Sequence, residues 1–376
     1  MSKRVRTVQF ALAERISHLD ASAWNALTKD SSVFLKAPFL TALERALPDN
    51  VSPRYALMYQ GDEAVAALCM QVVQLDGRSV SSTTPLGGLS QLLNQRALVL
   101  GNFAGWGETG LAMKEGADAS LVWNETLRLM DRLRRFEKLE GHVNVSFVKD
   151  AGREDDEPAL RKHGYQRAPS GPDMLLELDP KWGSLDDYLA CLASKRRRAV
   201  KKTIEDLAGY ELRRLTMTEL RQHESRLDEL YGQVWASAEV RPLRLSGKFF
   251  VELQQQLGED CVVMGLLREG RLEGFGVSLR SGTSCTGYYL GYEKSVEAPL
   301  YFRLLVSILE QGLAWKCARV SMGRTAEEPK ARLGAAPGGT ALWVKHRTPP
   351  LNWAVGAVLG SIEVPAVETY RVFHQE

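Results

Sequence analysis

The sequence predicts a protein of the α/β (α+β) class with two domains, each a mixed β-sheet flanked by helices. Its 376 residues exceed the roughly 250–300 at which a single hydrophobic core usually stops growing. In the second half, three strand-like runs joined by short glycine turns precede a further helix and strand. The first half repeats this order less regularly, which indicates an internal duplication.

Helical periodicity and capping residues define the helices of the second half, and short apolar runs between turns define its strands. The predicted helices cover residues 185–207, 216–235, 246–257, 299–315 and 326–333; the predicted strands cover 211–215, 261–268, 272–280, 285–292, 319–322 and 341–346. Ser184 and Ser246 are N-caps, and Pro299 opens a helix at its favoured first position. A three-strand meander followed by a crossover gives a mixed sheet covered by helices.

The first half follows the same order. Its predicted helices cover residues 24–27, 38–47, 120–139 and 158–163, and its predicted strands cover 54–59, 64–75, 97–100, 143–148 and 174–178. We expect the domain boundary near Asp179-Pro180, with an N-terminal domain of residues 1–178 and a C-terminal domain of residues 179–350. No low-complexity linker marks this boundary, so we expect the two domains to pack together.

Residues 351–376 form an unusually apolar C-terminal tail. Three roles are open for it: it covers the sheet of the second domain, it binds a lipidic acyl chain, or it touches a membrane surface. We expect the first.

Composition excludes several classes of protein. The formal net charge is only +2, so a nucleic-acid partner would need a local basic patch. The five cysteines are far apart and form no Cys-x-x-Cys pair, which argues against a disulfide framework and a local zinc site. No uncharged apolar run of about 18 residues and no signal-peptide pattern is present, so we expect a cytoplasmic protein.

Four short motifs resemble those of a known family. They are Phe39-Leu40-x-x-Leu43-Glu44, Lys195-x-Arg197, Gly291-Tyr292 and Pro329-Lys330-x-x-Leu333-Gly334. Together with the element order, they resemble the bacterial acetyltransferase-like domains of the N-acetyltransferase (GNAT) superfamily, in its tandem, FemAB-like branch. The resemblance implies two GNAT-like domains and transfer of an acyl group to an amine.

One loop departs from the superfamily pattern. The resemblance implies an Arg/Gln-x-x-Gly-x-Gly/Ala loop that grips the pyrophosphate of coenzyme A, but residues 291–299 contain two glutamates and no glycine pair. The following helix N-terminus would still attract a phosphate. The donor is therefore left open between an acyl coenzyme A, an acyl carrier protein and, as in FemAB proteins, an aminoacyl-tRNA.

In such a fold the splayed strands of the meander line the donor site, where we expect Tyr288, Tyr289, Tyr292 and Glu293. A tyrosine hydroxyl, that of Tyr289 by preference, can protonate a leaving thiolate, and Glu293 can accept the proton of the amine. Tyr288 and Tyr292 are expected to bind the donor. The alternative is structural: of two consecutive tyrosines on a strand, one packs and one faces solvent, and a loop carboxylate is solvated.

The resemblance implies that Lys330, early in the last short helix, faces the active-site cleft and stabilises developing charge. A lysine near a helix start is unfavourable to the helix dipole, so its placement needs a reason. Arg324, just before this helix, is a candidate fork for a phosphate or carboxylate. A solvated surface lysine is the alternative.

The densest cluster of charge comprises Lys195, Arg196, Arg197, Arg198, Lys201 and Lys202. On a helical projection Arg196 falls in the middle of the apolar side. An unpaired guanidinium is costly to bury, so we expect Arg196 to pair with a carboxylate or to line a cleft between the domains and bind an anionic ligand. The remaining cations are expected to form a solvated face.

In the first domain a glycine-rich loop, residues 101–110, occupies the position equivalent to the donor loop. It lacks the spacing of a P-loop or a dinucleotide fingerprint. We expect this loop to line the acceptor site, with Asn102 and Trp106 as contacts.

These observations predict an N-acyltransferase that moves an acyl group from a thioester of coenzyme A or a carrier protein to an amine of a small acceptor, without a metal. One alternative is an aminoacyl-tRNA-dependent transferase, which the low net charge disfavours. Another is a non-catalytic binding protein on a degenerate transferase fold.

Overall fold

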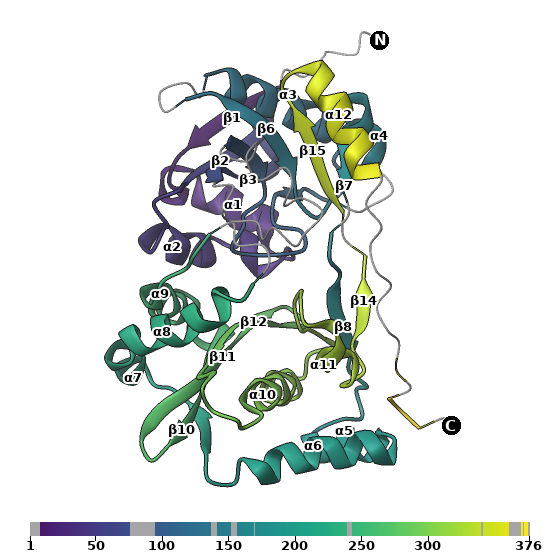
Figure 1. Cartoon of the computed structure of the whole chain (residues 1–376). Coiled ribbons are helices and arrows are strands. Elements are labelled where there is room, and N and C mark those ends of the chain that lie inside the picture. Colours follow the sequence, from purple (N-terminus) through teal and green to yellow (C-terminus); the bar gives the residue numbers. More distant parts are fainter. Residues whose placement is uncertain are drawn as a thin grey trace. The chain divides into compact units, whose positions relative to one another are not determined.

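The computed structural model describes residues 8–75, 95–136, 141–151, 156–168, 170–238, 243–339, 341–360, 370 and 372–374. The chain divides into two compact units (Figure 1). Unit 1 comprises Met1–Ser170, Glu239–Arg244 and Thr340–Val364, and unit 2 comprises Gly171–Ala238, Leu245–Gly339 and Pro365–Glu376. The chain therefore passes between the units more than once.

Unit 1 contains an eight-stranded sheet in the order β1-β2-β3-β4-β6-β15-β7, with β5 paired to β3. The strands are β1 (Val8–Ala13), β2 (Val51–Gln60), β3 (Glu63–Leu75), β4 (Gln95–Leu100), β5 (Leu111–Met113), β6 (Val143–Val148), β7 (Gln166–Ala168) and β15 (Leu342–His346). Strands β4 and β6 are parallel, as expected for a pair joined by a helical crossover, and the other pairs are antiparallel.

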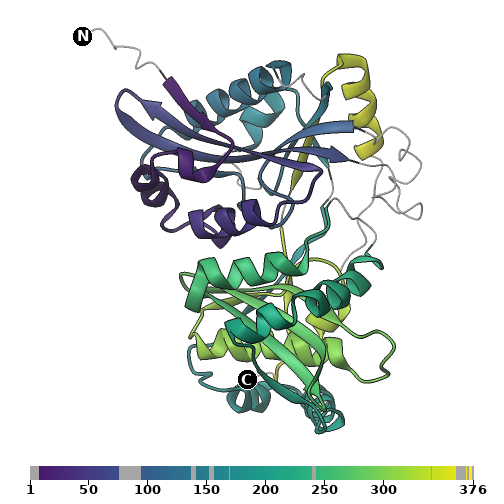
Figure 2. The same cartoon turned by 90° about the vertical axis from the view of Figure 1, so that its left-hand side faces the viewer.

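Helices cover both faces of this sheet (Figures 1 and 2). They are η1 (Ile16–His18), α1 (Ala21–Thr28), η2 (Val33–Leu35), α2 (Ala37–Arg45), α3 (Ala119–Phe136), α4 (Glu157–Lys162) and α12 (Pro349–Gly360). Val122, Leu127 and Met130 of α3 are buried in the main core against Leu98 of β4, whereas α1 and α2 lie on the opposite face.

Unit 2 contains a seven-stranded sheet in the order β14-β8-β13-β12-β11-β10-β9. The strands are β8 (Asp173–Glu177), β9 (Glu211–Arg214), β10 (Cys261–Arg268), β11 (Arg271–Ser281), β12 (Ser284–Tyr292), β13 (Arg319–Ser321) and β14 (Ala336–Gly338). Its helices are α5 (Leu185–Cys191), α6 (Ser194–Asp206), α7 (Met217–Gln222), α8 (Glu224–Trp235), α9 (Gly247–Leu257), η5 (Gly258–Asp260), α10 (Leu300–Ala314) and α11 (Glu327–Ala331). Helices α8 and α9 lie on one face of the sheet and α10 lies on the other (Figure 1).

The predicted class and the two mixed sheets are confirmed, but two predicted helices are each divided. The helix predicted over residues 185–207 breaks between α5 and α6, where Leu192 and Ala193 are extended, with ψ of 142° and 140°. Here Leu192 forms a bridge with Phe373, and the N–H of Ala193 donates to Val372 at 2.9 Å. The pairing of this stretch with the C-terminal segment accounts for the break. The helix predicted over 216–235 divides into α7 and α8 at His223.

The predicted domain ranges need correction. Strand β15, assigned from the sequence to the second domain, pairs with β6 and β7 in unit 1. Strand β8, assigned to the first domain, pairs with β13 and β14 in unit 2. The two strands are exchanged between the halves because backbone pairing, not position along the chain, decides which sheet a strand joins.

The role preferred for the C-terminal tail holds only in part: Val372 and Phe373 pack in the core of unit 2, but the helix of the tail covers unit 1. Helix α12 packs on β7 and β15 of unit 1, where Val355 and Leu359 contact Ala168 and Val344. Residues 361–369 lie outside the described part of the chain. In the described helices, no segment is both long and apolar enough to cross a membrane.

Candidate functional site

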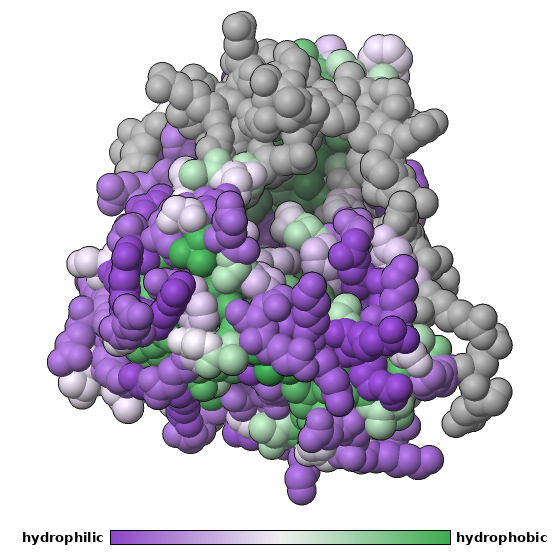
Figure 3. All heavy atoms as spheres, turned by 60° about the horizontal axis from the view of Figure 1, so that its bottom comes forward, coloured by the Kyte–Doolittle hydropathy of each residue, from purple (hydrophilic) through white to green (hydrophobic). Residues whose placement is uncertain are grey.

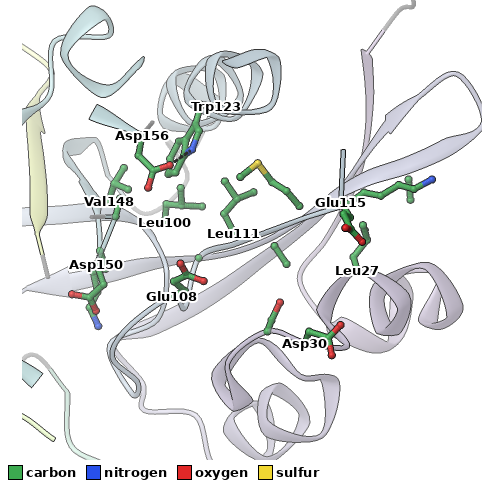
Figure 4. A pocket seen from close by; sticks show the side chains of 18 of the residues that line it. Leu27, Asp30, Leu100, Glu108, Leu111, Glu115, Trp123, Val148, Asp150 and Asp156 are labelled. Atoms are coloured by element: carbon green, nitrogen blue, oxygen red, sulfur yellow. Dashed lines mark hydrogen bonds between the residues drawn. The ribbon is translucent and has the colours of Figure 1, made fainter. Parts of the chain in front are cut away.

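A pocket of about 610 Å³ lies in unit 1 beside α1, α3 and the carboxyl ends of β4 and β6. Its charged lining residues are Asp30, Glu108, Lys114, Glu115, Lys149, Asp150 and Asp156, five carboxylates against two ammonium groups. Glu108, Asp150 and Asp156 lie toward one end of this acidic pocket, and Asp30 and Glu115 lie toward the other (Figure 4). The excess of negative charge favours a cationic ligand.

Asp150 lies two residues beyond β6 and has a left-handed backbone, with a φ of 57°. Aspartate is one of the few residues other than glycine that adopt this conformation at modest cost. Its buried carboxylate accepts a hydrogen bond from the N–H of Gly107 at 3.0 Å. The preceding Lys149 donates to the carbonyl oxygens of Asn102 and Gly105, both at 2.7 Å. Two consecutive side chains thus anchor the glycine-rich loop beside the pocket.

Asp156 is the second buried carboxylate of the pocket. The indole N–H of Trp123, on α3, donates to its Oδ1 at 2.7 Å (Figure 4). A hydrogen bond from a neutral donor leaves the negative charge of the carboxylate in place.

The glycine-rich loop reaches the acidic pocket through Glu108 and Gly110, but the two contacts expected from the sequence, Asn102 and Trp106, do not line it. Asn102 is fully buried, and its amide nitrogen donates to the carbonyl of Phe34 at 3.3 Å. The ring of Trp106 packs against that of Phe34, with centroids 5.4 Å apart.

Sequence reasoning missed Asp150 and Asp156. A signal was present for Asp150, because a charged pair directly follows the predicted strand 143–148, and ligands of open α/β sheets bind at the carboxyl ends of the strands. For Asp156 no pattern in the sequence marks the side chain as buried.

Unit 2 contains the strand arrangement expected of a donor site. Parallel strands β12 and β13 pair over three residue pairs, ending at Thr286 and Ser321. Beyond that point β12 continues to Tyr292 against β11, while the N–H of Met322 donates to the carbonyl oxygen of Met174 in β8. The two parallel strands therefore part at Thr286 and Ser321.

Tyr288 and Tyr289 lie at a bulge in β12. The pairing register shifts between Gly276 and Ser278 of β11, so the two tyrosines together lie opposite Val277 alone. Their rings are 4.5 Å apart between centroids. A bulge interrupts the alternation of side chains, which accounts for two neighbouring rings on one side of the sheet.

Both rings pack against other rings, and of the two only Tyr289 keeps part of its surface exposed. Tyr288 is buried against Phe249, with centroids 6.2 Å apart, and the partly exposed Tyr289 packs edge-on against Tyr231 at 5.3 Å. Burial raises the pKa of both hydroxyls. They are protonated at neutral pH, as a proton donor must be.

Tyr292 and Glu293 begin the loop between β12 and α10. Tyr292 is partly buried beside Tyr301, with ring centroids 5.9 Å apart, and burial raises the pKa of its hydroxyl. The carboxylate of Glu293 accepts from Arg226 at 2.9 Å and from the hydroxyl of Ser295 at 2.9 Å. The Arg226 guanidinium is the main cause that lowers the pKa of Glu293 to about 2. A carboxylate this acidic is a weak base, so the geometry favours a structural ion pair over the predicted proton acceptor.

Lys330 is buried rather than solvated, with 3% of its surface exposed. Its Nζ donates to three carbonyl oxygens, those of Gly323 at 2.9 Å, Arg324 at 2.8 Å and Thr325 at 2.7 Å. Burial lowers the pKa of Lys330 to about 8. All three N–H donors of an ammonium are thus engaged by the backbone, so Lys330 holds this loop and has no donor left for a reacting oxygen.

The loop that Lys330 holds is strained, since Thr325 and Ala326 both have positive φ, 64° and 47°. Arg324 lies between the strand and this turn with its side chain partly exposed. Its charge, together with that of Lys330, acts on the nearby carboxyl of Asp173.

Asp173 of β8 was not predicted. Both oxygens of its carboxylate lie within hydrogen-bond distance of the hydroxyl of Ser321, at 2.7 and 2.8 Å. Burial raises the pKa of Asp173, while Ser321 and Arg324 oppose that shift. No pattern in the sequence indicates that Asp173 lies beside Ser321. The strand β8 was assigned to the first domain from the sequence, whereas in the structure it pairs in the sheet of unit 2.

Arg196 is partly exposed on α6, and its guanidinium lies over the ring of Tyr370, 4.7 Å from the centroid. Tyr370 donates to Glu328 at 3.4 Å. The apolar side of α6 is therefore closed around Arg196 by a cation–π contact, and not by a carboxylate, which was the first of the two expectations for this residue. No group of three or more potential metal ligands is found within the part of the chain that the structure describes.

Known proteins provide an independent comparison. A family profile, FemAB-like, described as peptidoglycan biosynthesis/recognition, matches residues 111–358. A search of curated proteins finds no match.

Among solved structures, that of FemX is similar with a TM-score of 0.58 and 10% identity, covering 90% of this chain and 99% of FemX. A tandem GNAT protein from the clavulanic acid biosynthesis pathway, solved without acetyl coenzyme A, has a TM-score of 0.52 and 12% identity, with 91% and 99% covered. The C-terminal domain of a lysylphosphatidylglycerol synthetase homologue from Agrobacterium fabrum has a TM-score of 0.53 and 9% identity, with 89% and 94% covered. At these identities the likeness establishes the fold, and the family match extends over most of the chain. The protein is thus a member of the FemAB-like family with a tandem GNAT fold.

Proposed function

We propose that the protein transfers an acyl group from a thioester to the amine of a small acceptor, which binds in the acidic pocket of unit 1. The observation that carries this proposal is the pocket itself, with five carboxylates around a volume of about 610 Å³. A volume of this size suits a small molecule, and the carboxylates favour an ammonium group.

The same carboxylates suit the chemistry of acylation. An aliphatic amine is an ammonium ion at neutral pH and must lose a proton before its nitrogen can attack a carbonyl. Asp150 and Asp156 are buried carboxylates that line the pocket, and either can accept that proton directly or through water. The nitrogen–carbon bond then forms, the carbon–sulfur bond breaks, and the thiolate takes up a proton.

The thioester donor is supported by the fold and by unit 2. One structural neighbour is described with reference to acetyl coenzyme A. In unit 2 the parallel strands part beside Tyr289, whose protonated hydroxyl fits the role of proton donor to a thiolate. We assign Tyr292 and Arg324 to donor binding.

The test is binding of amines to the intact protein. A panel of small mono- and diamines, each paired with its N-acetylated analogue, is titrated in thermal-shift and calorimetric assays, since a ligand of the native state raises the melting temperature. The amines should bind and their neutral analogues should not. Asp150→Asn keeps an acceptor for Gly107 but removes the charge, and should weaken amine binding by at least about tenfold.

Asp62→Asn is the matched control, because Asp62 is an exposed residue in the turn between β2 and β3. Its affinity for amines should equal that of the wild type. Equal binding of amines and acetylated analogues, or an unchanged affinity in Asp150→Asn, would refute the pocket as the acceptor site.

A second candidate function is transfer from an aminoacyl-tRNA. The exposed cations of α6 favour it, because phosphate groups bind such surfaces. The discriminating assay offers the same amines with aminoacyl-tRNA or with acyl thioesters. Ribonuclease-sensitive transfer from the former alone would replace the first proposal.

A further inference from the structure

We propose that α6 is the docking surface for an acidic carrier protein that delivers the acyl thioester. This inference rests on the proposed function and specifies the form of its donor. It is carried by the charge of α6, by its place in unit 2 and by the character of the adjacent donor loop.

The solvent side of α6 is a row of cations. Lys195, Arg198, Lys201 and Lys202 are exposed and Arg197 is half-buried. None of the five forms an ion pair with an acidic side chain in the described part of the chain. Hydrophilic side chains dominate this face of the molecule (Figure 3). The patch is therefore uncompensated positive charge, available to a partner.

The opposite side of α6 fixes the helix to unit 2. Val200 and Thr203 are buried, and at the N-terminal end Arg196 lies over Tyr370. Helix α6 also contacts α10. A helix held in this way presents its cations in a fixed geometry, which lowers the entropic cost of docking.

The C-terminal end of α6 lies beside the donor loop. Leu207, which follows the helix, shares a hydrophobic cluster with Leu300 and Leu304 of α10 and with Tyr292 and Val296 of the loop. A partner bound to α6 would thus sit near the loop between β12 and α10. A flexible prosthetic arm can cover the remaining distance.

The donor loop is poorly suited to a pyrophosphate. Its Glu293 carboxylate is held ionised by Arg226, which lowers its pKa to about 2. The ion pair with Arg226 occupies the start of this loop, and the loop has no glycine pair to hold a pyrophosphate, in conflict with the anion that the N-terminus of α10 would otherwise attract. A carrier protein avoids this conflict. Its prosthetic arm bears one phosphodiester instead of a pyrophosphate, and the carrier itself can be bound by α6.

The size of the patch favours an acidic protein over RNA. From Lys195 to Lys202 the patch extends over roughly 12 Å of helix. Acidic residues lie at both ends of the patch along the chain. They are Asp186 and Asp187 in α5 and Glu205 and Asp206 at the end of α6. A nucleic acid carries its charge continuously and binds broader basic surfaces, whereas one acidic helix matches this length.

The experiment measures binding and transfer separately. The binding probe is a bacterial holo acyl carrier protein labelled with a fluorophore on its pantetheine thiol, titrated with the full-length protein at low and high salt. The comparison variants are Arg198→Glu/Lys202→Glu and the control Lys248→Glu, which reverses an exposed cation on α9 of the same unit. The double variant should bind the carrier at least tenfold more weakly than the wild type, and the control should bind it like the wild type. High salt should weaken carrier binding by the wild type and by the control.

Transfer to the amine is then measured with an acyl carrier protein and with acyl coenzyme A as donors. The double variant should lose acyl transfer from the carrier protein. Its rate of transfer from acyl coenzyme A should equal that of the wild type. If the double variant binds the carrier as tightly as the wild type, or if no carrier binding is seen, the inference is overturned. The proposed acylation of amines from coenzyme A would then still stand. Carrier binding through α6 without transfer from any donor would instead refute the proposed function. A labelled tRNA whose binding depends on Arg198 and Lys202, with no carrier binding, would assign the patch to RNA.

Discussion

Lys149 and Asp150, consecutive in the chain, hold the same loop through opposite groups. The lysine ammonium donates hydrogen bonds to the carbonyl oxygens of Asn102 and Gly105, and the aspartate carboxylate accepts one from the N–H of Gly107. Both side chains also line the acidic pocket. The wall of the pocket and the support of the glycine-rich loop are thus built from one dipeptide at the end of β6.

Lys149→Met should destabilise unit 1, because two carbonyl oxygens lose their charged donor. Hydrogen bonds of this kind contribute about 1–3 kcal/mol, so the free energy of unfolding in urea should fall by that amount. Lys29→Met, at an exposed lysine after α1, is the control and should be near neutral. Equal stability of the two variants would contradict the anchoring role.

Lys330→Met should release the turn that follows β13. Three carbonyl oxygens lose their common donor. The backbone at Thr325 and Ala326, strained by its positive φ angles, then loses the hydrogen bonds that hold it. Limited trypsin digestion should cut after Arg324 several-fold faster than in the wild type, as mass spectrometry of the fragments can show. Lys248→Met should leave this cleavage unchanged. A rate that does not rise in Lys330→Met would count against a clamp.

Glu293→Gln should alter stability in acid. The pKa of Glu293 is about 2 in the folded protein, below its ordinary value of 4.5, so its charge stabilises the fold above pH 4.5. That contribution is lost progressively as the pH falls from 4.5 toward 2, because in this window the Glu293 carboxyl of the unfolded chain takes up a proton while that of the folded protein stays ionised. The melting temperature of the wild type should therefore fall more steeply across this window than that of the variant. Glu297→Gln, in the exposed part of the same loop, should keep the wild-type slope.

Leu359→Asp tests whether α12 belongs to unit 1. Leu359 is 9% exposed and contacts Ala168 and Val344, so a carboxylate there would be buried without a partner. Unfolding free energy should fall by about 2 kcal/mol or more. The matched control is Leu351→Asp on the same helix, where the side chain is 50% exposed and the loss should be small. If both variants lose the same stability, α12 does not cover this sheet.

Much of the local structure could be predicted from the sequence. Strands 143–148 and 261–268 were predicted with the bounds that the structure gives to β6 and β10. Short strands were missed, among them β5, β7 and β14, each of three residues. Three residues carry too little periodicity to be distinguished from a loop, and such strands exist because a neighbouring edge pairs with them.

The candidate site was predictable in part. The position of Arg196 on the inner side of its helix followed from angular projection, since that depends only on helical geometry. The pairing of Glu293 with Arg226 did not follow, because the two residues are 67 positions apart. The same holds for Lys330, whose three partners are nearby carbonyls that only the turned backbone of residues 323–326 brings together.

By itself the sequence determined the class of the fold, the two mixed sheets and most of the helices, because these depend on hydrophobic period, caps and turns within short windows. Only the tertiary structure decided that β8 and β15 exchange sheets, that α12 covers unit 1, and that Asp150 and Asp156 meet in one pocket. These features arise from backbone pairing and from charges brought together across the chain, and no local pattern of residues encodes which distant partner a strand edge or a carboxylate will find.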